Sequence, residues 1–214
     1  MRGLIRFLLW LSILTAIVLG GLRLTIFRTI RLPTNDPVFE ASLVPSISGG
    51  DTILLSRVSS PILGDLVLCP EPDAPERFII GRIIAEAGAN IEIRDGKPYL
   101  NGKAFIYQHN CDPTRVEYPH PDNEGETVSQ VCQYEEIGHT LHRTGVVIPP
   151  ATPEDLDYDI PQDFVFLLSD NRAFPYDSRD YGLVPIDSCR ETVVGRLWSR
   201  KGWLDADNRL NYIP

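Results

Sequence analysis

The chain begins with a long apolar segment, which limits how its N-terminus can fold. Residues 7–22 carry no charged side chain and consist mostly of Leu, Ile and Val, between Arg6 and Arg23. The bilayer core offers backbone polar groups no water to bind, so such a segment crosses it only as a helix of roughly 20 residues. Both flanking arginines can extend to the interfaces. The sequence therefore predicts one membrane-spanning helix near residues 3–28.

A cleavable signal peptide is the alternative interpretation of this segment. Its basic start and apolar centre fit, but the following stretch, LGGLRLT, contains no site of the A-x-A type. We therefore favour a retained anchor, which with its flank occupies residues 1–31. The orientation stays open, because arginines flank both ends and the positive-inside rule then gives no clear answer.

The distribution of charge excludes one class of partner. The chain of 214 residues has a net charge of −9, and its first 31 residues hold five arginines and no acidic residue, so the remainder carries −14. A body this acidic repels the phosphates of nucleic acid, which we do not expect as a partner. Hydrophobic residues make up 43% of the chain, which predicts a packed core rather than disorder.

The four cysteines favour disulfides over a metal site. Their spacing contains no C-x-x-C pair or His/Cys pattern, so no metal is expected. An even count in an exported domain favours disulfides, although four buried free thiols are the alternative. Cys111 and Cys132 bracket a segment rich in Pro, Asp, Asn, Gly and Glu. The count alone allows three connectivities; we predict a Cys111–Cys132 bridge at the base of an exposed loop.

Beyond the anchor, the sequence predicts a mainly β fold with antiparallel strands. Short runs rich in β-branched and aromatic residues are bounded by Gly, Pro, Asp or Asn. Asp95-Gly96 and Asn101-Gly102 are strong hairpin signals. The expected strands lie within residues 51–58, 64–70, 77–85, 90–107, 144–149, 163–171 and 191–199.

The pattern also predicts how the body is divided. Residues 104–162 are more acidic and more irregular than the rest, which is typical of an insertion. We expect a β-rich core made of residues 32–103 and 163–214, with residues 104–162 as an inserted cap region.

Three motifs follow one another along the chain. SLVPSISGGDTILL begins at Ser42, GRIIAEAGANIEIRDGKPYLNG at Gly81, and SDNRAFPYDSRDYGLVP at Ser169. In order and spacing they resemble the nucleophile box, the following box and the final box of the signal peptidase I family, which are membrane-anchored Ser/Lys peptidases (S26-like). The single N-terminal anchor matches as well, whereas residues 104–162 match only loosely.

This resemblance implies a membrane serine endopeptidase that removes signal peptides from exported proteins. It also implies a mainly antiparallel β catalytic core with an inserted cap, on the extracytoplasmic side of a single-pass membrane anchor. The expected partners are signal peptides of exported pre-proteins and membrane lipid, with an active signal peptidase as a further candidate. No cofactor or metal is implied.

The resemblance also assigns residues to roles. Ser42 falls on the nucleophile, and Arg82 on the arginine that follows the general base. The matches in the final box belong to a structural corner beside the nucleophile rather than to proton transfer; they are Asp170, Asn171, Arg172, Asp177, Ser178 and Arg179.

Three positions depart from the family pattern. The general-base lysine is replaced by Gly81, which has nothing to titrate. The serine that donates to the oxyanion aligns with Glu40, whose carboxylate would repel a developing negative charge. The serine that holds the lysine aligns with Pro175. A lost general base typically costs about 10²–10⁴ in rate and a lost oxyanion donor about 10²–10³.

These departures predict little or no activity by the usual Ser/Lys mechanism. We therefore expect a signal-peptidase-like scaffold that still handles signal peptides, in other words a pseudoenzyme. One alternative is an active peptidase in which Glu40 is the substitute base, because residues i and i+2 share a face of an extended segment. Another is a specialised leader peptidase of a secretion or conjugation system.

Overall fold

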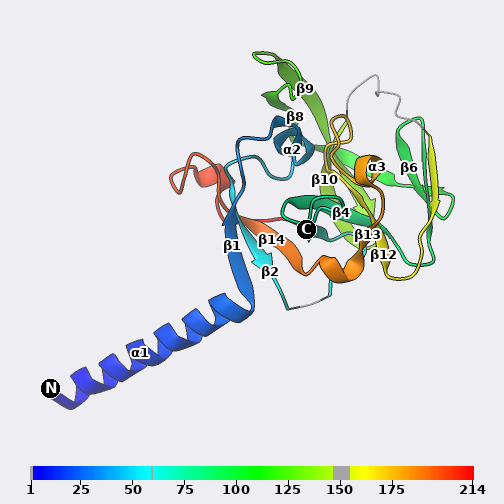
Figure 1. Cartoon of the computed structure of the whole chain (residues 1–214). Coiled ribbons are helices and arrows are strands. Elements are labelled where there is room, and N and C mark those ends of the chain that lie inside the picture. The colour runs from blue at the N-terminus through cyan, green and yellow to red at the C-terminus, as the bar shows by residue number, and fades with distance from the viewer. Residues whose placement is uncertain (1, 59, 147–154) are drawn as a thin grey trace.

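The computed structural model describes residues 2–58, 60–146 and 155–214 (Figure 1). A long helix, α1 (Arg2–Thr25), projects away from a body whose described residues form three antiparallel β-sheets. The described part of the body also carries two short α-helices, α2 (Pro37–Ser42) and α3 (Ser178–Tyr181), and two 3-10 helices, η1 (Ile186–Ser188) and η2 (Ala206–Asn208). The expected mainly β fold with one N-terminal helix is confirmed.

Helix α1 contains the residues that are able to cross a bilayer. Its segment Gly3–Gly21 is long and apolar enough to span a membrane, and none of it is buried in the body. Trp10, for example, is 72% exposed. The helix ends at Thr25, short of the predicted end, because strand β1 (Phe27–Arg31) begins there and pairs with β2 (Thr52–Ser56). The free-standing apolar helix fits a membrane anchor.

The largest sheet has eight strands and holds most of the core. Its order is β1-β2-β14-β3-β4-β12-β13, with β15 paired to β14. The bounds of the remaining strands are β3 (Leu66–Pro70), β4 (Phe78–Glu86), β12 (Phe164–Leu168), β13 (Val184–Pro185), β14 (Glu191–Trp198) and β15 (Asn211–Tyr212).

Strand β4 is buried on both faces, which explains why its sequence is apolar except for Arg82 and the terminal Glu86. One face contributes to the α2 cluster, which consists of Leu32, Phe39, Leu43, Ile47, Ile53, Leu55, Leu66, Ile80, Val193 and Ile213. The other contributes to the Leu167 cluster, which consists of Val67, Cys69, Ile79, Ile83, Val165, Leu167, Val184 and Cys189. Because side chains alternate along a strand, Ile80 and Arg82 lie on the first face and Gly81 on the second.

A three-stranded sheet occupies most of residues 104–162, the region expected to be an inserted cap. Strands β8 (Ile106–Pro119), β9 (Thr127–Ile137) and β10 (Thr140–Val146) form it in the order β10-β9-β8. Nearly every side chain of β8 is exposed, so no alternation of apolar residues marks it as a strand. Of the strand expected at 144–149, residues 147–149 lie outside the described part of the chain.

A second small sheet joins segments from both sides of the expected core–cap boundary. It has the order β11-β5-β6-β7 and contains β5 (Asn90–Arg94), β6 (Lys97–Leu100), β7 (Lys103–Ala104) and β11 (Leu156–Asp159). Asp95 and Asn101 adopt positive φ angles of 48° and 50° at the two turns. These are the Asp-Gly and Asn-Gly hairpins expected from the sequence.

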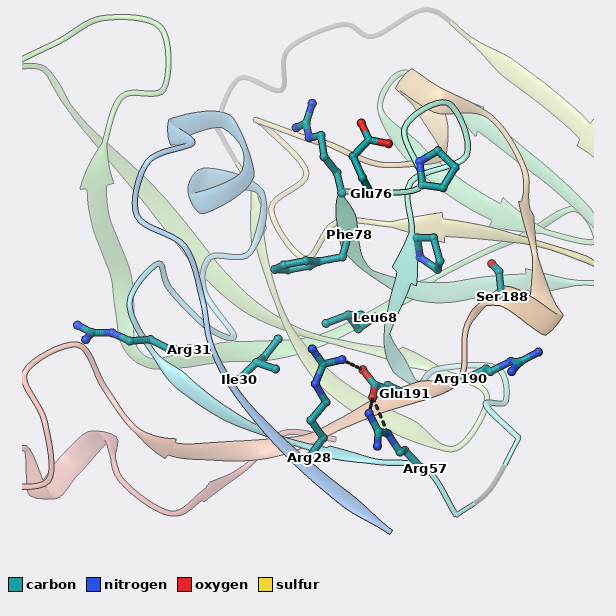
Figure 2. A pocket seen from close by; sticks show the side chains of 13 residues that line it. Arg28, Ile30, Arg31, Arg57, Leu68, Glu76, Phe78, Ser188, Arg190 and Glu191 are labelled. Atoms are coloured by element: carbon teal, nitrogen blue, oxygen red, sulfur yellow. Dashed lines mark hydrogen bonds and ion pairs between the residues drawn. The ribbon is translucent and has the colours of Figure 1, made fainter. Parts of the chain in front are cut away.

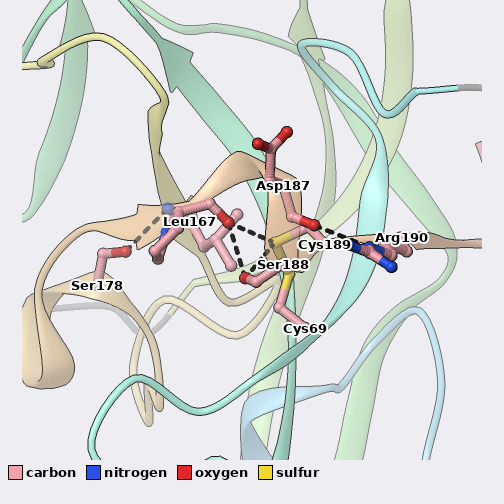
Figure 3. Close-up of a disulfide and its surroundings, with 8 residues drawn as sticks. Cys69, Leu167, Ser178, Asp187, Ser188, Cys189 and Arg190 are labelled. Carbon is pink, nitrogen blue, oxygen red and sulfur yellow. Dashed lines mark hydrogen bonds between the residues drawn. A yellow bond between two sulfur atoms is a disulfide. The ribbon is translucent and has the colours of Figure 1, made fainter.

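All four cysteines are paired in two disulfides. The Cys111–Cys132 bridge links β8 to β9, so it joins two paired strands rather than closing an irregular loop. The Cys69–Cys189 bridge links β3 to the segment before β14, and Figure 3 shows it beneath η1, next to Leu167. Both cysteines of this second bridge are buried in the Leu167 cluster.

Replacing Cys111 and Cys132 together by serine should lower the free energy of unfolding by about 3 kcal/mol. The bridge closes a loop of 21 residues, and the loop-entropy relation gives that magnitude. Urea unfolding of the oxidised protein and of the double variant measures the difference. Peptide mapping without reductant is the control, and both thiols found free would contradict the pairing.

Candidate functional site

The site is built around the short helix α2, which ends at Ser42. The Asp36 side chain caps the helix by accepting a hydrogen bond of 3.1 Å from the Phe39 amide, and Pro37 occupies a first-turn position where no amide is needed. Ser42 is only 1% exposed. Its Oγ donates a hydrogen bond of 2.8 Å to the Phe39 carbonyl oxygen. The hydroxyl at the nucleophile position is therefore bonded back to its own helix.

Asn171 holds the end of this helix. Its amide donates to the Ser42 carbonyl at 3.1 Å, and its Nδ2 donates to the Ala41 carbonyl at 2.7 Å. Nδ2 also lies 2.8 Å from the Tyr118 hydroxyl, while Oδ1 accepts from Gln130 Nε2 at 2.7 Å. The final motif thus fixes the first motif and connects both to the sheet of β8 and β9.

A buried ion pair joins the second motif to the third. Arg82 Nε and Nη2 donate to the two oxygens of Asp170 at 2.8 and 2.9 Å. Arg82 also donates to the Gly64 carbonyl, and Ser46 Oγ donates to Asp170. Burial raises the pKa of the Asp170 carboxyl, but the charge and hydrogen bonds of Arg82 outweigh it and lower this pKa to about 2. Asp170 is therefore a fixed anion and a poor proton acceptor.

Asp177 and Arg179 form a second buried corner. Asp177 begins α3 with a capping box and accepts from Arg179 Nε and Nη2 at 2.9 and 2.7 Å. Its Oδ2 also accepts from the Ser169 amide at 2.8 Å. Ser178 Oγ accepts from the Leu167 amide at 3.0 Å. Asp177 and Ser178 therefore connect α3 to the end of β12, as expected of a structural corner.

Replacing Arg179 by alanine should lower the free energy of unfolding by about 3 kcal/mol. It leaves the fully buried Asp177 carboxylate without its charged partner, and breaking a buried pair on one side costs about 3–5 kcal/mol. The two backbone amides that still bond Asp177 place the effect at the low end. Thermal and urea unfolding measure it, with the exposed Arg115→Ala as a matched control. An unchanged melting temperature for Arg179→Ala would contradict this structural role.

Arg172 extends the network into the sheet of β8–β10. Its Nη1 donates to Glu135 Oε1 at 3.1 Å, and its Nη2 bonds the other oxygen. His142 Nε2 lies 3.3 Å from Glu135 Oε2 and 3.8 Å from Asp170 Oδ1. Burial, and then the charge of Arg82, lowers the pKa of His142. The buried charges of the two sheets therefore form one connected group.

Sequence reasoning missed the contributions of the sheet of β8–β10. Glu135, His142, Gln130 and Tyr118 contact the motif residues, yet they lie in segments without a recognised motif. Glu and His are seldom buried within a strand, but nothing in the sequence marks these two as buried. Their partners Asp170 and Arg172 lie in the loop after β12, and only the tertiary structure brings that loop against β9 and β10.

Gly81, which the family resemblance aligns with the lysine, lies in the middle of β4. It pairs with Val67 of β3, and a Cβ atom added to it would lie 3.0 Å from Leu167 Cβ. The neighbouring Ile80 packs with Phe39 of helix α2, on the other face of the strand. A lysine side chain at this position would therefore have to start against Leu167.

None of the chain's three lysines supplies a substitute amine. Lys97 and Lys103 are exposed on β6 and β7, and Lys201 is exposed near the C-terminus. A lysine serves as a neutral base only when burial or a nearby charge depresses its pKa. None of the three lysines is buried, so none is placed as such a base requires.

The argument that placed Glu40 beside Ser42 is wrong. Residues 37–42 form a helix rather than an extended segment, and residues two apart do not face each other on a helix. The Glu40 carboxylate instead lies against Gly49. Burial raises the pKa of Glu40, while Arg200 opposes the shift.

Pro175 occupies the third departed position. It lies between Phe174, which packs against the Tyr118 ring, and Tyr176, whose hydroxyl donates to Glu71 Oε1 at 2.6 Å. Proline has neither a hydroxyl nor an amide hydrogen, so it offers an amine no hydrogen bond from its side chain.

A groove runs beside α2. It has a volume of about 260 Å³ and is lined by Pro33, Asn35, Asp36, Phe39, Glu76, Arg77 and Phe78. The rings of Phe39 and Phe78 meet edge to face at 5.6 Å. Among the residues that the structure describes, no group of three or more His, Cys, Asp or Glu is placed to hold a metal ion.

The chain is similar to several known peptidases. It is 27% identical over 193 residues to Signal peptidase I of Aquifex aeolicus (strain VF5), covering 74% of this chain and 72% of that protein. It is 25% identical over 173 residues to Thylakoidal processing peptidase 1, chloroplastic, of Arabidopsis thaliana, of which it spans only 40%. A crystal structure of a signal peptidase I from Enterococcus faecalis V583 aligns at 19% identity with a TM-score of 0.40, over 63% of this chain and 97% of that one.

The sequence profile of one family covers nearly the whole chain. The family is described as signal peptidase, peptidase S26, and its profile matches residues 4–198. This range runs from within α1 to the end of β14 and includes all three motifs. The chain therefore belongs to the signal peptidase family, peptidase S26.

Proposed function

We propose that this signal peptidase I-like protein binds the signal peptides of exported pre-proteins but scarcely cleaves them by the Ser/Lys mechanism. The proposal rests on one observation: the residues that hold the site together are present, but the general-base lysine is not. Ser42 stands at the nucleophile position, Gly81 stands at the lysine position, and every lysine of the chain is exposed.

The frame around the site supports retained binding. Asn171 still holds the end of α2, and the Arg82–Asp170 and Asp177–Arg179 pairs are formed. Loss of one member of a buried ion pair destabilises the fold, because the remaining member is a buried charge without a partner. A fold that keeps both complete preserves the geometry of the surface beside α2.

The groove beside α2 offers a place for the peptide. Phe39 and Phe78 provide apolar surface, and Arg77 and Asp36 form an ion pair of 3.2 Å at its edge. A concave site with apolar walls and a few polar groups is the usual form of a ligand pocket.

The missing groups support slow cleavage. Among the described residues, no lysine amine is buried beside Ser42 to take its proton, and the Ser42 hydroxyl donates to the Phe39 carbonyl instead. The serine that the family uses as an oxyanion donor aligns with Glu40, which offers no hydroxyl to donate. Residues that act as a unit fail together, so the losses do not simply multiply.

The location follows from the anchor and the disulfides. We infer that α1 crosses the membrane once and that the β-body lies on the extracytoplasmic side. Two disulfides in the body are expected in an oxidising compartment and rare in the cytosol.

A binding assay with the full chain in lipid nanodiscs tests the proposal. A fluorescently labelled signal peptide should bind saturably and be recovered intact, and a scrambled peptide should bind at least about tenfold more weakly. Phe78→Ala should weaken binding, whereas Tyr99→Ala on the distant sheet should not. Equal binding of both peptides, or no effect of Phe78→Ala, would contradict the proposal.

A further inference from the structure

A second, larger pocket lies where the body meets the anchor. It has a volume of about 890 Å³ and is formed by residues of β1, β3 and β4 together with the segment that enters β14. Figure 2 shows Ile30, Leu68 and Phe78 between two charged ends. Arg28, Arg57 and Glu191 form one end, and Glu76 lies towards the other. We call this site the arginine pocket.

The pocket is cationic although the protein is acidic. Five arginines and two glutamates line it, whereas the chain as a whole carries −9. Arg28 Nη1 and Arg57 Nε donate to the two oxygens of Glu191 at 2.9 and 2.6 Å. One carboxylate thus faces two guanidinium groups, which leaves one positive charge uncompensated. Their side chains are still 48% and 38% exposed, so further N–H donors remain accessible to a ligand.

The charged end of the pocket is the end next to the membrane anchor. Strand β1 begins at Phe27, two residues after α1 ends at Thr25. Four helical and three extended residues separate Gly21 from Arg28, which allows at most about 16 Å of rise. Figure 2 shows Arg28 and Arg57 on the side where β1 enters the body. The headgroups of the bilayer therefore lie within reach of these arginines.

The combination of groups matches an amphiphilic anion. Arginine binds phosphate oxygens through paired N–H donors, and the adjoining Ile30, Leu68 and Phe78 offer apolar contact. We propose that the arginine pocket binds the headgroup phosphate of an anionic phospholipid, with the glycerol and first acyl carbons against the apolar floor. The same phosphate chemistry is available from free phosphate, which lacks the apolar part.

The occupant orients the body on the membrane. A lipid held at the foot of β1 places the sheet edge at a fixed height above the bilayer. The groove beside α2 shares Glu76, Arg77 and Phe78 with the far end of the pocket. A peptide entering that groove is therefore presented next to the bound headgroup.

Titration of the full chain in neutral detergent, followed by native mass spectrometry, tests the proposal. The probes are dihexanoyl-phosphatidylglycerol, dihexanoyl-phosphatidylcholine, inorganic phosphate and a synthetic signal peptide. We expect one molecule of phosphatidylglycerol to bind at least about tenfold more tightly than phosphatidylcholine or phosphate. Arg57→Gln should weaken that binding about tenfold, Arg57→Lys, which keeps the charge but not the paired donors, should restore it only in part, and the exposed Arg115→Gln should not change it.

Several results would overturn the assignment. Equal affinity for the two lipids, or unchanged binding in Arg57→Gln, would exclude recognition of the anionic headgroup. Phosphate binding as tightly as phosphatidylglycerol would make the site a simple anion site. Competitive displacement of the lipid by a more tightly bound signal peptide would make it part of the peptide site. Arg28→Gln is the second variant if Arg57→Gln lowers the melting temperature, because Arg57 then still pairs with Glu191.

Discussion

Asp170→Asn should lower the free energy of unfolding by about 3–5 kcal/mol, because it leaves Arg82 buried without its counter-ion. Arg82 is fully buried and keeps only carbonyl partners after the change, among them Gly64. Urea unfolding at neutral pH measures the loss. The exposed Asp122→Asn is the matched control and should have little effect.

The same pair gives a pH dependence with a definite sign. The pKa of Asp170 is lowered from 3.8 to about 2 in the folded protein, so the pair contributes its full stability above the unfolded value. That contribution is lost as the pH falls from about 4 through about 2. The acid limb of the stability curve should therefore be shallower in Asp170→Asn than in the unchanged protein. Equal acid limbs, or an unfolding free energy at neutral pH that is unchanged in Asp170→Asn, would contradict the assignment of a folded, ionised Asp170.

Restoring the lysine alone should not restore the peptidase. In Gly81→Lys the new side chain begins against Leu167, while Glu40 and Pro175 still stand where the family has serines. We expect the single variant to stay within about tenfold of the unchanged protein. The triple variant Gly81→Lys, Glu40→Ser, Pro175→Ser should have a higher kcat/KM than the single variant, because it also removes the Glu40 carboxylate and restores the two serines of the family pattern.

Gly81→Ala is the control for the packing cost of any side chain at this position. The melting temperature of Gly81→Ala shows whether Leu167 can move aside for a side chain. The melting temperature of Gly81→Lys is therefore compared with that of Gly81→Ala. If Gly81→Lys alone cleaved at the rate of an active signal peptidase I, the residues at positions 40 and 175 would have no effect on the rate.

The elements that were predictable from sequence are those with a local signal. The apolar run gives α1, the β-branched runs give the central strands, and the glycine turns give the hairpins of β5–β7. The three motifs placed Ser42, Arg82 and Asp170 in one region because the family resemblance carries their spacing. Each of these signals lies within about 20 consecutive residues.

The parts that were not predictable depend on contacts between distant segments. Most side chains of β8 are exposed, so its sequence lacks the alternation that indicates a strand. His142 lies near both Glu135 and Asp170 only because β9 and β10 pair in one particular register. The helix α2 had a local signal, the Asp36-Pro37 start, but only the structure shows the short turn that separates Glu40 from Ser42. Which face of β4 Gly81 takes is likewise set by packing against Leu167.

The rate of signal-peptide cleavage decides whether the protein is a peptidase. The full chain and its Ser42→Ala variant, each in lipid nanodiscs, are incubated with a pre-protein beside an active signal peptidase I at equal concentration. We expect cleavage at least about 10³-fold slower than by the active enzyme, and the same residual rate in Ser42→Ala. A rate equal to that of the active enzyme, abolished by Ser42→Ala, would contradict it.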